Sequence, residues 1–465
     1  MNMINVRRLT VMTFLGASML SGISAQVSPL QVDTLKETKI PDQWDLQSCI
    51  DYAKEQNITI RKNRITAVST QIDVKTAKAA LFPSLSFSTG QQVVNRPYQE
   101  TSSRVSGSEI ISSNSKTSYN GNYGLNASWT LYNGNKRLKT IQQEKLNNQM
   151  AELDVATSEN NIQESIAQVY IQILYAAESV KVNENTLQVS IAQRDRGQEL
   201  LNAGSIAKSD LAQLEAQVST DRYQLVTAQA TLEDYKLQLK QLLELDGENE
   251  MNIYLPALSD ENVLAPLPTK RDVYISALSL RPEIEASKLN VEASELGINI
   301  AKSSYFPTIS LSAGIGTNHT SGSDFTFGEQ VKNGWNNSIG LSVSVPIFNN
   351  RQTKSAVQKA KLQYETSILS LLDEQKALYK TIESLWLDAN SAQQRYAAAN
   401  EKLKSTQISY ELISEQFNLG MKNTVELLTE KNNLLQAQQE QLQAKYMAIL
   451  NTQLLKFYQG DQLAL

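Results

Sequence analysis

The sequence holds few side chains that could perform catalysis or bind a metal ion. Among its 465 residues there is a single cysteine, Cys49, and a single histidine, His319. One cysteine cannot form an internal disulfide or a thiolate metal cluster, and one histidine makes a His-based metal site or catalytic triad improbable. The sequence also has no Gly-rich phosphate loop and no nucleophile–base pair. We therefore predict a protein that is not an enzyme and needs no cofactor or metal, with Cys49 a packed thiol and His319 in an external loop.

The overall composition narrows both the partners and the fold. The chain carries 43 basic and 48 acidic residues, a net charge of −5 with no basic cluster, which argues against nucleic acid as a partner. It has 19 glycines and 10 prolines, below the usual usage of roughly 7% and 5%. Because glycine and proline interrupt helices, their scarcity favours long helices over a turn-rich all-β domain.

Residues 1–25 have the pattern of a secretory signal peptide. Two arginines precede an apolar run over residues 9–23, and two small residues follow it. This order predicts cleavage before Gln26. An uncleaved anchor is the alternative, but the run is short for a membrane span, and no later segment offers the ~20 consecutive apolar residues of a transmembrane helix.

The chain consists of two copies of one unit. Residues 81–88 match residues 305–312, which lie 224 positions later, and residues 124–211 match a second stretch at an offset of 216. The change of offset places a length difference of eight residues between Gly90 and Gly124. Self-similarity of this kind indicates two structural repeats, whose remaining elements should have equal lengths.

Each copy contains two segments in which apolar residues alternate with small polar ones. Alternation predicts strands with one apolar face. These segments are residues 85–89 and 125–131 in the first copy and 309–315 and 339–347 in the second, with Ser/Asn/Gly-rich loops predicted over 94–122 and 317–336. Aromatic residues flank the strands, at one level Phe82, Tyr132, Phe306 and Phe348, and near the other level Tyr123 and Trp335.

Two interpretations of these strands are open, a pair of soluble hairpins that cover a core or a set of strands that cross a membrane. Charge-free apolar faces with aromatic residues at both ends favour the membrane. Four strands cannot close a barrel, and open sheet edges cannot lie in lipid. A membrane barrel would therefore need other copies of the chain: a dimer would supply eight strands and a trimer twelve.

A very long helix is predicted after the second strand of each copy. Apolar or small residues recur there with spacings of four and three, which is a heptad seam. The seam positions are Ile162, Ile166, Val169, Ile173, Ala176, Val180 and Leu187 in the first copy and Leu378, Ile382, Leu385, Ala389, Ala392, Tyr396, Ala399, Leu403, Thr406, Tyr410, Ile413 and Phe417 in the second. Gly204 and Gly420 end the two helices in Asn-x-Gly turns, after ~100 Å of helix.

Shorter helices complete each copy. Return helices are predicted over residues 206–245 and 423–458, and helices that lead into the first strands over 46–81 and 271–305. Each spans about half of a long helix, so two of them can stack beside it. The predicted organisation is a signal peptide at 1–25, a first repeat at 26–245, an equatorial linker at 246–270 that bulges outward, and a second repeat at 271–465.

The predicted fold class is mainly α with a transmembrane β part. The duplicated strand–long-helix units of several copies would form a β-barrel that is continued by an α-helical barrel outside the membrane. A heptad seam is also typical of a solid coiled-coil rod. Twelve helices joined to a membrane barrel cannot fill their own centre, however, so we expect a water-filled duct with a polar inner face.

The duplicated motifs resemble those of the TolC family of outer-membrane efflux and secretion channels. The matching features are the F-P-x-[LI]-x-[LF] junctions at Phe82 and Phe306, the strand-to-helix junctions Tyr132-Asn133 and Phe348-Asn349, and the paired N-x-G turns. The resemblance implies a homotrimer in the cell outer membrane, embedded in its lipid. The trimer would form a 12-stranded β-barrel, continued by a long periplasmic α-helical barrel that is closed at its tip. The resemblance also implies a passive exit duct of a tripartite efflux or type I secretion system. A periplasmic adaptor (membrane fusion protein) and an inner-membrane RND- or ABC-type transporter would open it.

The same resemblance suggests roles for residues near the two turns. By position, Asp210 and Lys422 look like a polar pair that holds neighbouring hairpins shut, with Ser209 and Phe417 beside them, while Glu426 resembles an acidic ring that narrows the entrance. Thr429 stands where some relatives carry a second carboxylate. The remaining implied sites are the turns Gly204 and Gly420, as tip turns in contact with the adaptor, and the membrane-interface aromatics Phe82, Tyr132, Phe306, Phe348 and Trp335.

A periplasmic coiled-coil adaptor or structural protein is the alternative function. An adaptor of the pump-linked type should carry compact β-rich domains on both sides of one helical hairpin, whereas this sequence predicts two hairpins of equal length without such flanks. As cargo of a duct, a drug, a detergent, a metal ion or a secreted polypeptide all fit, because a lining of polar residues selects little.

Overall fold

The structure is a computed structural model. It describes residues 40–98, 102–106, 109–113, 116–246, 251–256, 263–321, 323 and 325–463. The predicted signal peptide and parts of the predicted linker lie outside these residues. All elements given below belong to one unit, Pro41–Leu465.

The two repeats contain the same series of elements. The first consists of α2 (Leu46–Gln56), α3 (Ile58–Ala79), β1 (Ser84–Asn95), β4 (Thr117–Asn133), α4 (Lys136–Asn202) and α5 (Lys208–Leu242). The second consists of α6 (Lys270–Leu280), α7 (Pro282–Ser303), β5 (Thr308–Thr320), β6 (Asn336–Ser344), α9 (Gln352–Asn418) and α10 (Thr424–Gln459). Both long helices have 67 residues and start 216 positions apart, and α3 and α7 both have 22 residues and start 224 apart. The predicted duplication is confirmed.

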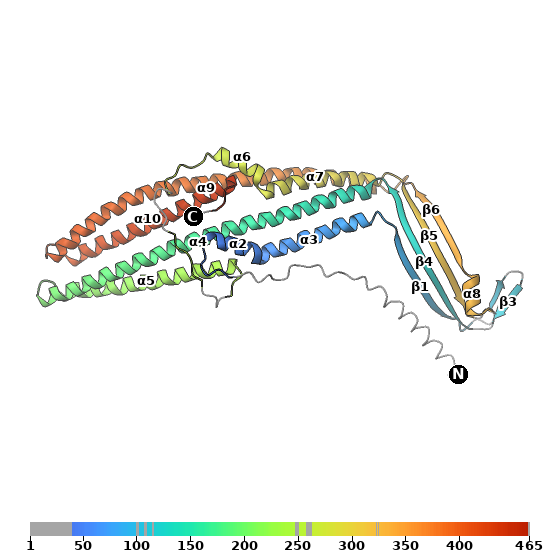
Figure 1. The fold of residues 1–465 in the computed structure, drawn as a ribbon, viewed down its shortest axis with the longest axis horizontal. Helices are drawn as coiled ribbons and strands as arrows, with labels where there is room; N and C mark the ends of the chain where they lie inside the picture. Colours follow the sequence, from blue (N-terminus) through green and yellow to red (C-terminus); the bar gives the residue numbers. More distant parts are fainter. Residues whose placement is uncertain are drawn as a thin grey trace, which may run out of the picture. The chain divides into compact units, whose positions relative to one another are not determined.

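Four strands form one antiparallel sheet in the order β1-β4-β5-β6, which lies at one end of the helices, while the α4–α5 and α9–α10 turns lie at the other (Figure 1). Leu85, Ala127, Ala313 and Ile339 lie opposite one another in a row across all four strands. Opposite residues in a sheet point to the same face. The alternating pattern therefore puts the apolar residues of both repeats on one common face.

The segments between paired strands differ from the predicted loops. β1 continues to Asn95 and β4 already begins at Thr117, while a separate hairpin, β2 (Ser102–Ser106) with β3 (Glu109–Ser113), lies between them. In the second repeat, β5 continues to Thr320, and the helix α8 (Phe327–Asn333) precedes β6. Both predicted loops were therefore too long, because the polar residues at these strand ends still pair across the sheet.

The prediction that His319 lies in a loop was wrong. His319 is in β5 opposite Gly121, and its ring stacks on Tyr123 with ring centroids 5.9 Å apart and meets Phe327 edge-on at 5.1 Å. Gly121 makes this possible, because a Cβ atom at that position would overlap the imidazole ring. The histidine is thus part of an aromatic cluster at the far end of the sheet.

The heptad seams of α4 and α9 are confirmed. Every predicted seam position is buried or half-buried, and α4 contributes Ile166, Tyr170 and Ile173 to the largest apolar core. That core also takes in Trp44, which lies just before α2, and Cys49 of α2. Within the described residues, no helix combines the length and the apolar composition needed to cross a bilayer.

The helices that lead into the sheet were predicted as continuous, and this was wrong in both repeats. They break at Asn57 and at Arg281, again 224 residues apart, where the backbone ψ angle is 127° and 123°. Pro282 causes the second break, because proline lacks an N–H donor and keeps the preceding residue out of the helical region. At the first break, Asn57 Oδ1 accepts the N–H of Thr59 at 2.9 Å and thereby caps α3.

The described parts of the linker between the repeats are bonded to neighbouring elements. Trp44 donates its N–H to Asn252 O at 2.8 Å and accepts the N–H of Tyr254 at 2.8 Å. Further along, Gln393 Nε2 of α9 donates to Val263 O at 2.9 Å and to Ala265 O at 2.8 Å. These contacts attach the linker to Trp44, which lies two residues before α2, and to the long helix α9.

Candidate functional site at the hairpin tips

The two helical turns have the same geometry. After α4, Gly204 has φ +72° and Ser205 N–H donates to Leu200 O at 2.8 Å; after α9, Gly420 has φ +74° and Met421 N–H donates to Gln416 O at 2.8 Å. Both turns are Schellman motifs, which require a left-handed residue that glycine supplies without strain. The Asn-x-Gly pattern therefore correctly predicted where each long helix ends.

At the first tip, Asp210 acts as a helix cap. Its Oδ2 accepts the N–H of Ala207 at 3.1 Å, one of the amides left without a helical partner at the start of α5. A carboxylate at this point also interacts favourably with the helix dipole. Ser209, the second residue of α5, is exposed beside it.

At the second tip, Lys422, Asn423 and Glu426 form a connected polar group. Asn423 and Glu426 form a reciprocal capping box, in which Glu426 N–H donates to Asn423 Oδ1 at 2.9 Å and Asn423 N–H donates to Glu426 Oε2 at 3.2 Å. Lys422 Nζ lies 2.5 Å from Glu426 Oε1. The hydrogen bond from Lys422, followed by that from the Asn423 amide, lowers the pKa of the Glu426 carboxyl below its ordinary value of 4.5.

The structure does not bring all predicted gate residues together within one chain. Lys422 pairs with Glu426 rather than with Asp210, because the two lie one helical turn apart at the start of α10. Phe417 is buried one residue before the end of α9. A contact between Asp210 of one copy and Lys422 of another involves two chains and stays a prediction.

The aromatic residues predicted at the membrane interface occupy the ends of the strands. Phe82 and Phe306 each lie two residues before a strand, Phe348 lies four residues after β6, and Trp335 directly precedes β6; all four are exposed. Tyr132 is half-buried near the end of β4. These positions fit the prediction, and the role of these residues at a lipid interface stays a prediction.

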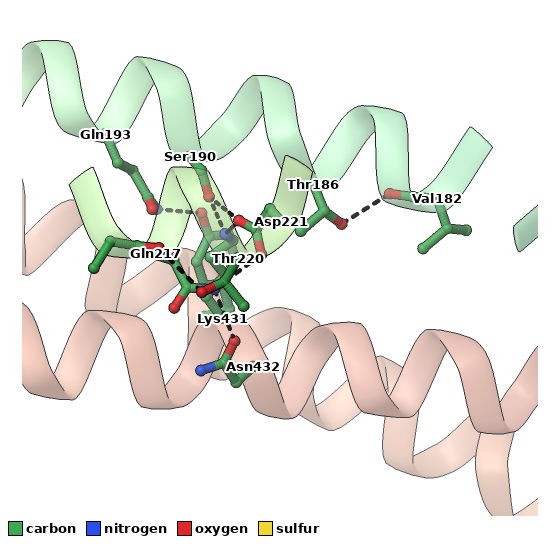
Figure 2. Close-up of polar contacts among 11 residues, drawn as sticks. Val182, Thr186, Ser190, Gln193, Gln217, Thr220, Asp221, Lys431 and Asn432 are labelled. Atoms are coloured by element: carbon green, nitrogen blue, oxygen red, sulfur yellow. Dashed lines mark hydrogen bonds and ion pairs between the residues drawn. The ribbon is translucent and has the colours of Figure 1, made fainter. Parts of the chain in front are cut away.

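A buried polar layer, which the sequence pattern did not predict, connects the two hairpins. Lys431 of α10 contacts Asp221 of α5 and Ser190 of α4, and Ser190 Oγ in turn donates to Asp221 Oδ2 (Figure 2). The side chains of Lys431 and Asp221 are only 4% and 1% exposed. We use the name polar layer for these three residues together with their polar neighbours Gln193, Gln217, Tyr410 and Asn432, which form further contacts between the hairpins.

A signal for this layer was present in the seams. Ser190 lies three residues after the predicted seam position Leu187, and Lys431 of α10 lies four residues from each of the buried leucines Leu427 and Leu435. A lysine at an otherwise apolar position is unusual, because a buried charge needs a partner. The partner, Asp221, is 210 residues away in the sequence, so the pattern alone could not identify it.

Two exposed apolar stripes were also missed. One follows α3 at Ile58, Ile65, Val68 and Ile72, and the other follows α9 at Leu362, Leu369, Leu372 and Tyr379. Successive residues in both stripes are three, four or seven positions apart, so each stripe lies along one side of its helix and forms a seam of its own. Neither is covered by the described part of the chain, where Ile65 is 53% and Leu369 65% exposed.

The described residues contain no group of three or more metal-ligating side chains that could hold an ion. Their defining features are instead the duplicated series of strand and long helix, the four-stranded sheet, and two matching hairpin turns. These features define a class of mainly α proteins in which a sheet of two strands per repeat is continuous with long helical hairpins.

Comparison with known proteins identifies the family. The family described as outer membrane efflux protein matches residues 49–244 and 273–460, that is, both repeats. The chain therefore belongs to the outer membrane efflux protein family, which confirms the resemblance, the predicted fold class and the predicted outer-membrane location. The match does not support the alternative of a periplasmic adaptor.

Individual relatives agree with this assignment. The chain is 24% identical over 294 residues to the outer membrane efflux protein BepC of Brucella suis and 24% identical over 294 residues to the outer membrane protein TolC of Escherichia coli. These alignments cover 63% and 61% of this chain and span 61% and 58% of the relatives' own lengths. The solved structure of the outer membrane protein VceC from Vibrio cholerae superposes with a TM-score of 0.73 at 16% identity, covering 90% of this chain and 97% of VceC, which shows a shared fold.

Proposed function

We propose that three copies of this chain form a passive duct through the outer membrane, closed at the hairpin tips and opened by other proteins. The observation that carries this proposal is the common order of strands and helices. α3 packs on α4, α4 on α7 and α7 on α9. These helices adjoin β1, β4, β5 and β6, so the helix row repeats the order of the sheet.

This common order leaves matching edges on either side of the chain. β1 with α3 forms one edge and β6 with α9 the other, and the outer side of each edge strand has no strand partner in the described residues. Because the sheet has an even number of antiparallel strands, β6 of one copy can pair antiparallel with β1 of the next. A sheet edge must be paired before it can lie in lipid, and three copies would close a barrel of twelve strands.

The two apolar stripes support the same closure at the level of the helices. The stripe on α3 begins seven residues before Ala79 and that on α9 ten residues after Gln352. They therefore start about 10 and about 15 Å from the sheet ends of their helices, and both extend beyond about 30 Å. Stripes that overlap in height on opposite edges of the chain can pack against each other only between different copies.

The exposed apolar face of the sheet supports insertion in lipid. Ile339, in the apolar row across the four strands, is 81% exposed. An apolar surface of this extent on a sheet is unfavourable in water, and the flanking aromatics Phe82, Tyr132, Phe306, Phe348 and Trp335 would lie at the two interfaces. The row of helices would then extend the barrel into the periplasm.

Closure of the duct would depend on the two hairpin tips. In the proposed resting state, Asp210 of one copy meets Lys422 of its neighbour, with Ser209 and Phe417 beside this contact and three copies of Glu426 around the opening. Lys422 is about one-third exposed and already pairs with one carboxylate, so its ammonium group can also donate to a second one. A ring of carboxylates would favour cations at the constriction.

The proposed partners follow from the passive role. The chain would bind a periplasmic adaptor at the tip turns Gly204 and Gly420, and an inner-membrane transporter of the RND or ABC type would supply the energy. Efflux is supported by the family description and by the name of BepC. Nothing in this role requires catalysis by the chain.

The ring arrangement can be tested by cross-linking the stripes. In a double variant, Ile65→Cys with Leu369→Cys, a short bis-maleimide linker should join α3 of one copy to α9 of the next. We expect covalent dimers and trimers on a denaturing gel and no larger species, because a closed ring of three has no free edge. The matched controls are the two single variants, each of which lacks one partner of the link.

Channel formation is tested on the same material. The purified trimer, reconstituted into planar bilayers, should show small and stable conductance steps that increase when Asp210 and Lys422 are both replaced by alanine. Purified protein that yields only monomers after cross-linking, or a ladder beyond trimers, would overturn the ring. Cross-linked trimers without conductance under any condition would overturn the duct.

A further inference from the structure

The polar layer is not a requirement of the repeated fold. At the offset of 216, the counterparts of Ser190 and Asp221 in the second hairpin are Thr406 and Ala437. Thr406 Oγ1 donates to Lys402 O of its own helix at 2.9 Å, and Ala437 is fully buried. The contact between Ser190 and Asp221 within the first hairpin thus has an uncharged counterpart within the second, while the counterpart of Lys431 is the exposed Glu215 of α5.

The layer concentrates the polar contacts between the hairpins near the tips. Residues 183–224 and 400–440 are joined by hydrogen bonds or ion pairs only within it. Apart from the contacts of Lys431, these are Gln193 Nε2 to Tyr410 Oη at 2.8 Å and Gln217 Nε2 to Asn432 Oδ1 at 3.4 Å. Lys431 is seven residues from the first residue of α10, about 10 Å along the helix.

The chemistry of a buried ion pair differs from that of the apolar seam around it. Burial lowers the pKa of Lys431, while Asp221 acts in the opposite direction. The lysine therefore pairs with Asp221 but loses the water that would surround its charge at the surface. When two such charges separate into water, they regain that hydration, whereas separated apolar side chains gain nothing. A polar group in an apolar seam therefore weakens the packing of the two helices against each other. It also restricts them to the one register in which the polar group is paired.

We propose that Lys431, Asp221 and Ser190 form a releasable clasp between the two hairpins of one chain. Lys431 is a positioning residue: it fixes α10 against α4 and α5 when the tip is closed, and it lets α10 separate from them when the tip opens. The clasp differs from the predicted contact of Asp210 with Lys422, which joins two copies. This inference rests on the proposed function, because it assumes a tip that opens.

Four variants separate a clasp from an ordinary packing contact. The first replaces the clasp by apolar residues of similar size: Lys431→Met, Asp221→Leu and Ser190→Ala together. The second is Lys431→Met alone, which leaves Asp221 buried without its partner. The third exchanges the charges, Lys431→Asp with Asp221→Lys. The matched control removes an exposed pair within the second hairpin, Lys402 with Glu440 at 2.7 Å, by Lys402→Met with Glu440→Leu.

The readout is the distance between the hairpins in the assembled protein. Spin labels at Ser219→Cys on α5 and Thr429→Cys on α10 occupy exposed positions close to the clasp, in a Cys49→Ser background. One labelled copy is diluted into unlabelled copies, so that only the distance within a chain is measured. Each clasp variant is compared with the unmodified clasp, both in the resting protein and in the Asp210→Ala, Lys422→Ala background, whose tip should be open.

The clasp predicts opposite effects for the first two variants. In the open background, the apolar triple variant should reduce the population of separated hairpins about five-fold or more, and Lys431→Met alone should raise it about two-fold or more even in the resting protein. The charge exchange and the Lys402–Glu440 control should stay close to the unmodified protein. A merely structural contact would instead let the apolar triple variant separate as readily as the native residues.

Specific results would overturn the clasp. These are an unchanged separated population in the apolar triple variant, or a resting Lys431→Met variant without any separated population. If the triple variant does not fold, the charge-exchange variant provides the test. The clasp would be overturned if the population of separated hairpins in that variant differed more than about two-fold from that of the protein with the native clasp. Because the distance is measured within one chain, failure of the clasp is distinct from failure of the duct, which cross-linking and conductance test.

Discussion

Tyr170 in α4 and Trp386 in α9 occupy equivalent positions of the two repeats, and each donates a hydrogen bond to a carbonyl of the segment that joins the repeats. Tyr170 Oη lies 2.6 Å from Tyr254 O, and Trp386 Nε1 lies 3.0 Å from Pro268 O. Lys270 additionally lies over the Trp386 ring, 4.8 Å from its centroid. The duplication thus supplies two equivalent anchoring points, one toward each end of a single linker.

The Tyr170 anchor can be tested by removing one oxygen atom. In Tyr170→Phe, the Tyr254 carbonyl loses its donor in a half-buried environment, and we expect the free energy of unfolding to fall by about 1 kcal/mol. Heat or denaturant unfolding in detergent measures the change. Tyr223→Phe is the matched control, because Tyr223 is 73% exposed and should tolerate the substitution. Equal losses in the two variants would contradict an anchoring role for Tyr170.

Features with a local cause could be predicted from the sequence. The lengths of the long helices followed from the internal match, and their buried faces followed from the heptad spacing, because burial of a helix depends on its own periodicity. The turns at Gly204 and Gly420 followed from the need for a left-handed residue after the last helical turn. The strand pairs followed from their alternation, although the sequence pattern made the loops too long.

Features that depend on contacts between distant residues could not be predicted. Periodicity marks a buried face but does not name what covers it, so the partners of Lys431 were missed. The same holds for the stripe on α3, whose proposed pairing with α9 of another copy depends on which helix lies at each edge of the chain. The break at Asn57 has a weaker local signal than Pro282, since asparagine is tolerated within helices as well as at their caps.

The turn glycines should tolerate few replacements although they have ample space. A Cβ atom at Gly204 or Gly420 would meet nothing within 4 Å, so any loss must come from the positive φ angle. Alanine there should destabilise the turn by about 1 kcal/mol and asparagine by less. Hydrogen exchange of the Ser205 and Met421 amides measures this locally. Gly328→Ala in α8, also in open space but without positive φ, is the control and should show no loss.

Glu426 should remain ionised below the pH at which an ordinary glutamate takes up a proton. Its pKa is lowered, first by the hydrogen bond from Lys422 and then by the amide of Asn423. A carboxyl group with a lowered folded-state pKa contributes stability above its unfolded pKa and loses it as the pH falls through the folded one. We therefore expect the start of α10 to stay protected at pH 4.5 and to lose protection only at lower pH.

Hydrogen exchange of residues 424–430, corrected for intrinsic rates, tests this pH dependence. Glu426→Gln should show weaker protection at neutral pH and little change on acidification. Glu440→Gln is the matched control, because Glu440 also has a lowered pKa, caused mainly by Lys402, but lies farther along α10. Loss of protection in native protein already well above pH 4.5 would refute the lowered pKa of Glu426.

Cys49 should be unreactive in the folded protein. Burial, with a smaller effect of the Asp45 carboxylate, raises the pKa of its thiol to about 12, and only the thiolate reacts with alkylating reagents. At pH 8 the thiolate fraction should be lower than that of a free cysteine by a factor on the order of 10³. Labelling of native and denatured protein measures this difference. In Cys49→Ser with Gln47→Cys, the thiol is exposed on the same helix and should react rapidly. Equally slow reaction there would contradict burial as the cause of the low reactivity of Cys49.

The apolar stripes allow a test of assembly by loss and rescue. Ile65→Lys places a charge where α3 should pack on α9 of the next copy, and it removes an apolar contact worth about 1.5–3 kcal/mol at each of three interfaces. We expect the trimer to dissociate in detergent while the chain keeps its helix content, because Ile65 is exposed within one chain. Adding Leu369→Glu should restore the trimer, since each lysine would then face a glutamate of its neighbour.

Light scattering in detergent gives the mass of each variant. Ile275→Lys, at an exposed position on α6 outside both stripes, should remain trimeric; a trimer that survives Ile65→Lys, or one that the second charge fails to restore, would place the contact between copies elsewhere.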